Sequence, residues 1–238
     1  MIAAGFFIEY LFDPASQLFF GCVVVTVIIS IVLHELAHGW AAIWQGDDTP
    51  QLQGHMTADP MVHMGGMSLL MLVLVGFAFG AMPVNPSNFR DKYGDALVSA
   101  AGPAMNFLLA LVSLIALGLW LKVGGIAAEG FPRNCQLLLT VFGCFNIALG
   151  IFNLLPVPPL DGSTVLGAFV PAYRRWMDSL GSPMFLFFIL FIVLMNAPFE
   201  YHPFGVAIRT SSHFIAMFGP DVHNFFIELL TTIFPWFK

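Results

Sequence analysis

The chain has 238 residues, of which 58% are hydrophobic and only 9% charged, and its mean hydropathy is +0.86. A soluble domain usually carries about 25% charged residues, so this composition argues against one and predicts a single integral-membrane domain over residues 1–238. The net charge of −6 comes from few groups, and we expect no nucleic-acid partner. The three cysteines lie in apolar runs, which indicates packing rather than a disulfide framework or a cysteine zinc cluster.

The first membrane-spanning helix is predicted over residues 17–44, a run long enough to cross the hydrocarbon at about 1.5 Å per residue. No lysine or arginine precedes Arg90, so this run lacks the basic start of a secretory signal peptide and is expected to be retained. Trp40 and Trp44 near its end suit an interfacial aromatic belt.

The same helix carries an HExxH motif, in which His34 and His38 are one turn apart and share a face. Two imidazoles placed in this way can take adjacent corners of a zinc tetrahedron. Glu35 is rotated away by about 100° and can act as a general base without joining the ligands. Three polar side chains in hydrocarbon are costly, which favours a functional cluster over a helix that only hydrogen-bonds to its neighbours.

The next stretch is less regular. Residues 51–64 lack a helical period and predict one or two short extended segments with a break at Asp59-Pro60. Residues 67–82 are apolar but short for a span, since a straight helix of this length covers about 24 Å against roughly 30 Å of hydrocarbon.

Two further spans are predicted over residues 95–121 and 134–155. Residues 163–180 are polar enough for a surface segment, residues 183–198 form another apolar helix, and residues 204–238 form a broken or interfacial pair of helices. We therefore expect an all-α polytopic membrane protein with about four to six transmembrane helices, a re-entrant hairpin and a short extended segment near the active site. Its catalytic core is expected over 17–165 and its C-terminal helices over 183–238.

Asp161 is the best candidate for a third metal ligand, because a zinc hydrolase needs three protein ligands and one open position. It follows a spanning helix and a proline-rich break, and it precedes Gly162. An aspartate in this position could instead cap a short helix starting near Ser163. The HExxH motif in the same membrane favours the ligand interpretation.

Three motifs carry a family resemblance. HExxH, then GPxxN at Gly102, Pro103 and Asn106, and then NxxPxPxLDG from Asn153 to Gly162 occur in one order over residues 34–162. The chain thereby resembles the site-2 protease family of intramembrane zinc metalloproteases. The segments 54–60 and 82–86 resemble the small branch of that family, which lacks PDZ and CBS domains.

The resemblance implies one Zn²⁺ held by His34, His38 and Asp161, with Glu35 as the catalytic acid and base. It also implies a place for Asn153 near the metal, where it would hold the substrate or the oxyanion. The implied activity is cleavage of a transmembrane segment of a client membrane protein within the lipid bilayer. The residues 51–64 could then offer a strand edge to an unwound client. No oligomeric state is predicted.

The topology follows from parity. The HExxH motif and Asp161 both lie toward the C-terminal ends of their helices, so an even number of crossings must separate them if they meet. The helices at 95–121 and 134–155 supply two, which makes 67–82 a re-entrant hairpin rather than a span. Basic residues favour the zinc face, which predicts an active site toward the cytoplasm. They are Arg90, Lys92, Arg174 and Arg175 on the zinc face, against Lys122 and Arg133 on the other.

Several alternatives stay open at this level. His55 and His63 could approach the site from a loop or could simply meet water, and Asn106 could pack between helices or act directly. At the level of function, the chain could be an inactive relative that binds membrane proteins without cutting them. It could also be a metal transporter, which would string histidines and acids along several helices at different depths.

Overall fold

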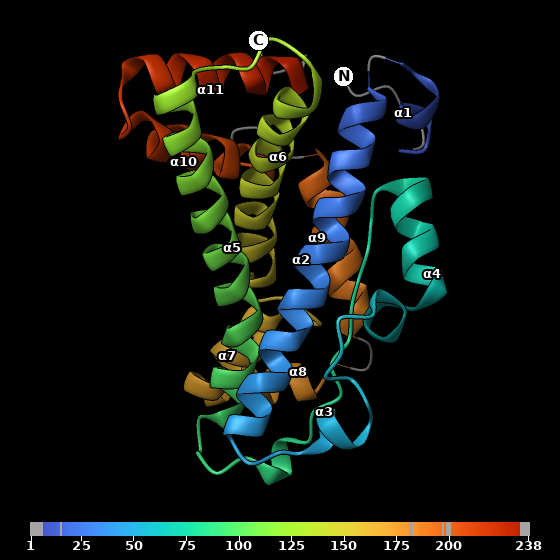
Figure 1. Ribbon diagram of the computed structural model, residues 1–238. Coiled ribbons are helices and arrows are strands. Elements are labelled where there is room, and N and C mark those ends of the chain that lie inside the picture. Colours follow the sequence, from blue (N-terminus) through green and yellow to red (C-terminus); the bar gives the residue numbers. More distant parts are fainter. Residues whose placement is uncertain (1–6, 15, 181–182, 197, 199–200, 234–238) are drawn as a thin grey trace.

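The computed structural model describes residues 7–14, 16–180, 183–196, 198 and 201–233, and every regular element in this part of the chain is a helix. Three long helices stand side by side (Figure 1): α2 (Gln17–Trp44), α5 (Gly94–Gly124) and α6 (Gly130–Asn153). They confirm the spans predicted over 17–44, 95–121 and 134–155. Each is long and apolar enough to cross a membrane.

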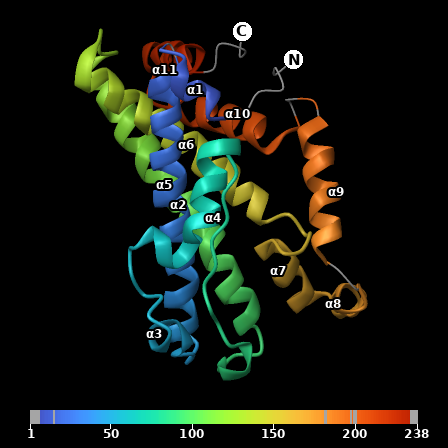
Figure 2. The ribbon, with the colours of Figure 1, turned by 90° about the vertical axis from the view of Figure 1, so that its right-hand side faces the viewer.

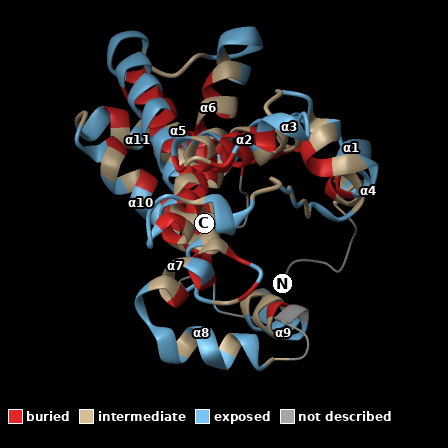
Figure 3. Cartoon of the chain, turned by 90° about the horizontal axis from the view of Figure 1, so that it is seen from below, coloured by how far each residue is buried: buried red, intermediate tan, exposed pale blue. Residues whose placement is uncertain are grey.

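The side chains of these helices divide into a buried inner face and an apolar outer face. Val27, Leu114 and Val141 pack in the core between them. The outer faces expose large apolar side chains such as Val112 and Leu119, which are 59% and 53% accessible. Figure 3 shows the buried residues gathered where α2, α5 and α6 meet. Apolar residues on both faces belong to a helix surrounded by lipid, so the chain is an integral membrane protein.

The segment after α2 forms the predicted re-entrant hairpin. Helix α4 (Pro60–Val75) ends at Gly76, whose φ of 79° is the left-handed conformation that favours glycine. Residues 77–85, which we call the returning segment, then run back beside α4 (Figure 2). The Ser68 hydroxyl donates to the Phe79 carbonyl at 2.7 Å and accepts from the Phe79 N–H at 2.8 Å.

Asp47, just beyond the end of α2, ties the hairpin to the bundle. Its carboxylate accepts hydrogen bonds from the Asn85 N–H at 2.7 Å and from Asn88 Nδ2 at 2.8 Å. Burial alone would raise the pKa of Asp47, but these bonds and those from Thr49 outweigh it and hold the pKa below its usual value. The hairpin therefore enters and leaves at the same end of the bundle, as the parity argument requires.

The extended segment predicted over 51–64 is wrong. Its first residues end helix α3 (Thr49–Leu52), its last residues begin α4, and the described part of the chain contains no strand. Pro50 and Pro60 occupy first-turn positions of these helices, where a fixed φ and a missing N–H favour the helix. The helical period is hidden because Gly65 interrupts α4 with a φ of 67°. The proposed strand edge for a client loses its basis here.

The remaining helices lie at the two ends of the bundle and along its side. Helices α7 (Asp161–Phe169) and α8 (Pro171–Asp178) lie at the lower end in Figure 1, beyond the end of α6. Helices α10 (Pro203–Ala216) and α11 (Pro220–Ile233) cross the upper end, with the predicted break at Gly219-Pro220 between them. Residues 234–238 lie outside the described part. Two short elements complete the fold, α1 (Glu9–Phe12) and the 3-10 turn η1 (Pro86–Asn88).

The number of crossings is only partly decided by helix length. Beside the three long helices, the described part of the chain has two shorter apolar ones, α4 and α9 (Pro183–Asn196). Helix α9 runs along the side of the bundle between its two ends (Figure 2) and spans about 21 Å. With α9 counted as a crossing, the chain reaches the lower limit of the four to six helices expected.

The hairpin generates a labelling prediction. Single cysteines at Gln53 and at Ser87, in a background from which Cys22, Cys135 and Cys144 are removed, should react with an impermeant maleimide from the same side of the membrane. The reason is that Asp47, at the end of α2, accepts hydrogen bonds from Thr49 ahead of the hairpin and from Asn85 and Asn88 behind it. The two flanking segments therefore meet at one end of the bundle. A cysteine near Gly125, at the other end of α5, is the control and should react from the opposite side. Labelling of Gln53 and Ser87 from opposite faces would refute the hairpin.

Candidate metal centre

Three side chains from two distant parts of the chain converge near the lower end of the bundle. His34 and His38 lie one turn apart on α2, and Asp161 is the first residue of α7. His34 Nε2 lies 3.2 Å from Asp161 Oδ2, and His38 Nε2 lies 3.4 Å from Asp161 Oδ1. The two histidine Nε2 atoms are 3.0 Å apart. Among the described residues these form the one group of three such side chains able to hold a metal ion.

The chain reverses direction sharply after α6, and this turn places Asp161 next to the two histidines. Tyr173, on α8, donates its hydroxyl proton to the Pro156 carbonyl at 2.9 Å and so ties the proline-rich turn to α8. Gly162 packs so tightly that a Cβ there would lie 2.1 Å from the Leu154 carbonyl oxygen. The capping alternative does not hold, because Leu160 is the N-cap residue and α7 has no side-chain cap. The glycine of the LDG motif is thus needed for the turn, and the aspartate is directed at the histidines.

Helix α5 approaches the group of His34, His38 and Asp161, which we call the metal cluster, at Gly102. A Cβ on Gly102 would lie 2.4 Å from His38 Nε2 and 2.5 Å from His34 Nε2. Val98 and Asn106, one turn to either side, contact the other nitrogen of each ring. His38 Nδ1 lies 2.7 Å from the Val98 carbonyl, and His34 Nδ1 lies 2.7 Å from Asn106 Oδ1. The three positions 98, 102 and 106 form one stripe along α5.

These contacts set the protonation of the neutral rings. An oxygen beside each Nδ1 requires the proton there, which leaves a lone pair on each Nε2. Two such lone pairs and a carboxylate then face one another, and the buried Asp161 Oδ2 accepts no hydrogen bond. Electron-rich groups packed in this way would be stabilised by a cation at their centre. Two imidazoles and a carboxylate are donors that Zn²⁺ accepts, so the residues fit that ion.

Glu35 lies outside this group of three, as its place on the helix predicts. It is 7% exposed, and the returning segment packs against it. A Cβ on Gly80 would lie 2.6 Å from Glu35 Oε1. Met56 and Met82 close the neighbouring side over Gly39. A carboxylate beside the metal cluster, enclosed but not used as a ligand, has the position of a general base.

The other predicted residues are less directly connected. Asn153 donates its Nδ2 to the Leu149 carbonyl of its own helix at 3.1 Å, and among the described residues no hydrogen bond or ion pair joins it to His34, His38 or Asp161. His63 is 3% exposed, with Nε2 bonded to the Thr57 carbonyl and Nδ1 without a partner. His55 bonds to the Gln53 carbonyl through Nδ1. Neither histidine belongs to the group of three.

Sequence reasoning missed part of the surroundings. From the sequence, Asn106 could either pack between helices or act directly in the chemistry. The structure shows its Oδ1 in contact with His34 Nδ1. Sequence reasoning did not find Val98, which acts through its backbone and leaves no signal in the residue type. Asn146 and Ser30, which continue the polar contacts behind Asn106, carried a usable signal, because a buried asparagine in an apolar span is costly.

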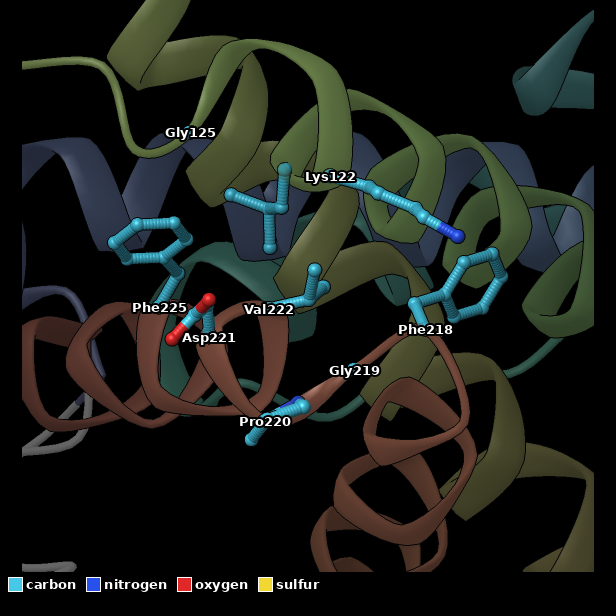
Figure 4. A pocket seen from close by; sticks show the side chains of 9 residues that line it. Lys122, Gly125, Phe218, Gly219, Pro220, Asp221, Val222 and Phe225 are labelled. Carbon is cyan, nitrogen blue, oxygen red and sulfur yellow. The ribbon is translucent and has the colours of Figure 1, made fainter.

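A cavity of about 360 Å³ lies elsewhere, at the far end of α5 (Figure 4). Lys122, Phe218, Asp221 and Phe225 line it, where α5 meets the start of α11. The 20 residues of helix between Gly102 and Lys122 cover about 30 Å. This cavity is therefore separate from the metal cluster.

Comparison with known proteins agrees with this geometry. The family model of peptidase family M50, the site-2 protease family, matches residues 22–131 and 128–196. The chain therefore belongs to this family of peptidases. The two matched ranges include the HExxH helix, the stripe on α5 and Asp161.

Among the similar proteins, "Putative zinc metalloprotease YwhC" of Bacillus subtilis is 32% identical over 217 residues, covering 89% of this chain and 98% of that protein. "Zinc metalloprotease MJ0392" of Methanocaldococcus jannaschii is 24% identical over 185 residues, covering 75% of this chain and 45% of that protein. "Putative zinc metalloprotease Rip2" of Mycobacterium tuberculosis H37Rv is 30% identical over 179 residues, covering 72% and 65%. No solved structure matches.

The close approach of α5 generates a prediction. Gly102→Ala should abolish most zinc binding, because the new methyl group would overlap both histidine Nε2 atoms. Zinc content of the purified protein, measured by atomic emission, checks this. Gly21→Ala, on α2 with nothing within 4 Å of the added carbon, is the matched control and should keep its zinc. A Gly102→Ala protein with full zinc would show that the α5 contact is not needed.

Proposed function

We propose that the protein is a zinc-dependent endopeptidase that cuts transmembrane segments of client proteins inside the bilayer. The observation that carries this proposal is the convergence of His34, His38 and Asp161 beside the buried Glu35. His34, His38 and Asp161 would hold one Zn²⁺. Membership of a peptidase family and the names of the similar proteins support the same chemistry.

Each residue of the site has a separate proposed role in hydrolysis. A Zn²⁺ ion held by the cluster would supply Lewis-acid chemistry toward water and the scissile carbonyl. Glu35 accepts a proton from the attacking water and returns it to the leaving amine. Val98 and Asn106 hold the two rings with their Nε2 atoms turned inward. Asn153 is the proposed contact to the substrate backbone or the oxyanion.

The depth of the site supports a membrane-embedded substrate. His38 is six residues from Trp44, the last residue of α2, which is about 9 Å along the helix. His34 is one turn deeper. A peptide bond in a helix is shielded by its own hydrogen bonds, so the client must unwind locally before it reaches Glu35. The partners proposed are therefore transmembrane client proteins and the lipid around them.

A cytoplasmic orientation of the active site is also proposed. Among the described residues, four basic side chains lie at the site end of the bundle: Arg90, Lys92, Arg174 and Arg175. Three lie at the other end: Lys122, Arg133 and Arg209. Arg209 on α10 was not assigned to either face from the sequence. Counting it reduces the excess of basic residues at the site end. The remaining bias still supports the cytoplasmic side.

The two other functions make different demands. A transporter would need metal-binding groups at several depths, whereas the described residues hold one such group at one depth. An inactive relative would have no need of Glu35, which here is buried next to the cluster. Both observations favour the peptidase.

The ligand assignment predicts metal content. Purified protein should hold about one zinc ion, and His34→Ala and Asp161→Ala should each lose most of it, because two ligands bind the ion far more weakly than three. Asp95→Ala, which removes an acid paired with Arg174 outside the cluster, should keep it. Full zinc content in both His34→Ala and Asp161→Ala would disprove the assignment.

The role of Glu35 predicts a separation of binding from catalysis. Glu35→Gln should keep zinc, since Glu35 is not a ligand, but should cut a transmembrane peptide about 10²–10⁴-fold more slowly. The assay is cleavage of that peptide in proteoliposomes, with the zinc content of each sample measured alongside. Glu228→Gln, an acid at the far end paired with Arg133, is the control and should cut normally. Near-normal cleavage by Glu35→Gln would contradict the mechanism.

A further inference from the structure

A chain of buried side chains leads from His34 through α5 into α6. Beyond the 2.7 Å contact of His34 Nδ1 with Asn106 Oδ1, Asn106 Nδ2 donates to Asn146 Oδ1 at 3.0 Å. Asn146 Nδ2 in turn donates to Ser30 Oγ at 2.8 Å and to the Phe142 carbonyl at 2.9 Å. Asn106 is 1% exposed, and Asn146 and Ser30 are fully buried. The chain is thus shielded from bulk water.

The direction of these hydrogen bonds has a single origin. An asparagine amide has two ends of similar size, a donor and an acceptor, so its neighbours decide which way it points. The Phe142 carbonyl can only accept, so it requires the Nδ2 of Asn146 on its side. Asn146 therefore presents Oδ1 to Asn106. Asn106 must then give Nδ2 to Asn146 and turn Oδ1 toward His34.

This direction ends at the metal cluster. Because Asn106 presents an oxygen, neutral His34 carries its proton on Nδ1 and keeps the Nε2 lone pair for a metal ion. If the Asn106 amide reversed, its Nδ2 would face Nδ1 and the His34 proton would move to Nε2. An N–H would then point into the cluster in place of a ligand. The tautomer of His38 does not depend on a side-chain amide, because its partner is the Val98 backbone carbonyl, which cannot reverse.

We propose that Asn146 is a positioning residue which, acting through Asn106, fixes the metal-binding tautomer of His34. This inference rests on the proposed zinc function and adds to it a residue on a third helix. Asn146 bonds to none of His34, His38 and Asp161, so it acts at one remove. Partners of metal-bound histidines typically change metal affinity by about 10–100-fold when they are removed.

Asn146 also links α6 to α2 and α5, and a test must separate this packing role from the tautomer role. Gln136 provides the matched control. It is a fully buried amide on the same helix, it donates to the Gly125 carbonyl at 2.9 Å, and it accepts from the Ala127 N–H at 2.9 Å. It lies at the opposite end of α6 from the cluster. Loss of either amide should lower thermal stability, but only Asn146 should affect zinc.

The experiment compares zinc affinity, measured by competition with a chromophoric chelator, in full-length protein in detergent. Asn146→Leu should bind zinc about 10–100-fold more weakly than wild type, and Gln136→Leu should bind it normally. Nitrogen NMR of the zinc-free protein, at a pH high enough that the His34 ring is observed in its neutral form, should show His34 with its proton on Nδ1 in wild type. In Asn146→Leu the signal of the Nε2-protonated form should appear.

A rescue variant makes the test specific. Asn106→Asp presents an oxygen to His34 whichever way the side chain turns, so it no longer needs Asn146 to orient it. Adding Asn106→Asp to Asn146→Leu should restore most of the lost zinc affinity. A pure packing defect would not respond in this way. If Asn146→Leu does not fold, Asn146→Ser, which is too short to contact both neighbours, takes its place.

The outcomes are distinct. Normal zinc affinity in the Asn146 variant, an equal loss in Gln136→Leu, or no rescue by Asn106→Asp would each overturn the proposal. None of these results would affect the peptidase function, provided that wild type binds zinc and Glu35→Gln stops cleavage. Failure of wild type to bind zinc would instead overturn the proposed function.

Discussion

Two imidazole nitrogens and a carboxylate directed at one point inside an apolar bundle are the constraint on which the rest of the structure depends. In a medium of low dielectric constant, such electron-rich groups repel one another unless a cation lies between them. Bringing them together also requires the backbone to come unusually close to its neighbours at two glycines. Gly102 allows α5 to reach the rings, and Gly162 allows the turn that delivers Asp161.

The hairpin has a different role, which is to enclose the Glu35 carboxylate on the lipid-facing side of α2. Helix α4 and the returning segment cover that side, and Gly80 lets the backbone lie against Glu35. The non-helical part of the hairpin satisfies its polar groups in part through α4. Ser68 pairs with Phe79, and the Ala81 N–H donates to the His63 carbonyl at 3.0 Å. This is the condition under which irregular backbone is tolerated at membrane depth.

The sequence was sufficient for features that depend on pattern and spacing. Apolar length gave the three long helices, the HExxH spacing placed His34 and His38 on one face, and parity gave the hairpin. The irregular stretch at 51–64 was misread, because proline at a helix start and a glycine kink at Gly65 erase the period on which such reasoning relies. The surroundings of the rings were only partly visible. Val98 contributes a backbone carbonyl, and two partners of Asn146, Asn106 and Ser30, come from other helices, so neither contact follows from one stretch of sequence.

The stripe on α5 has a consequence for how this protein can vary. The segment 98–106 places three contacts on the rings at intervals of four residues, and the segment 30–38 of α2 carries the rings and Ser30 at the same interval. Insertion or deletion of one residue within either segment would rotate everything beyond it by about 100° and carry part of the stripe away from the metal cluster. These two windows must therefore keep a fixed length in any functional descendant. The loops at the far end of the bundle, such as residues 125–129 between α5 and α6, are under no such restriction from the cluster.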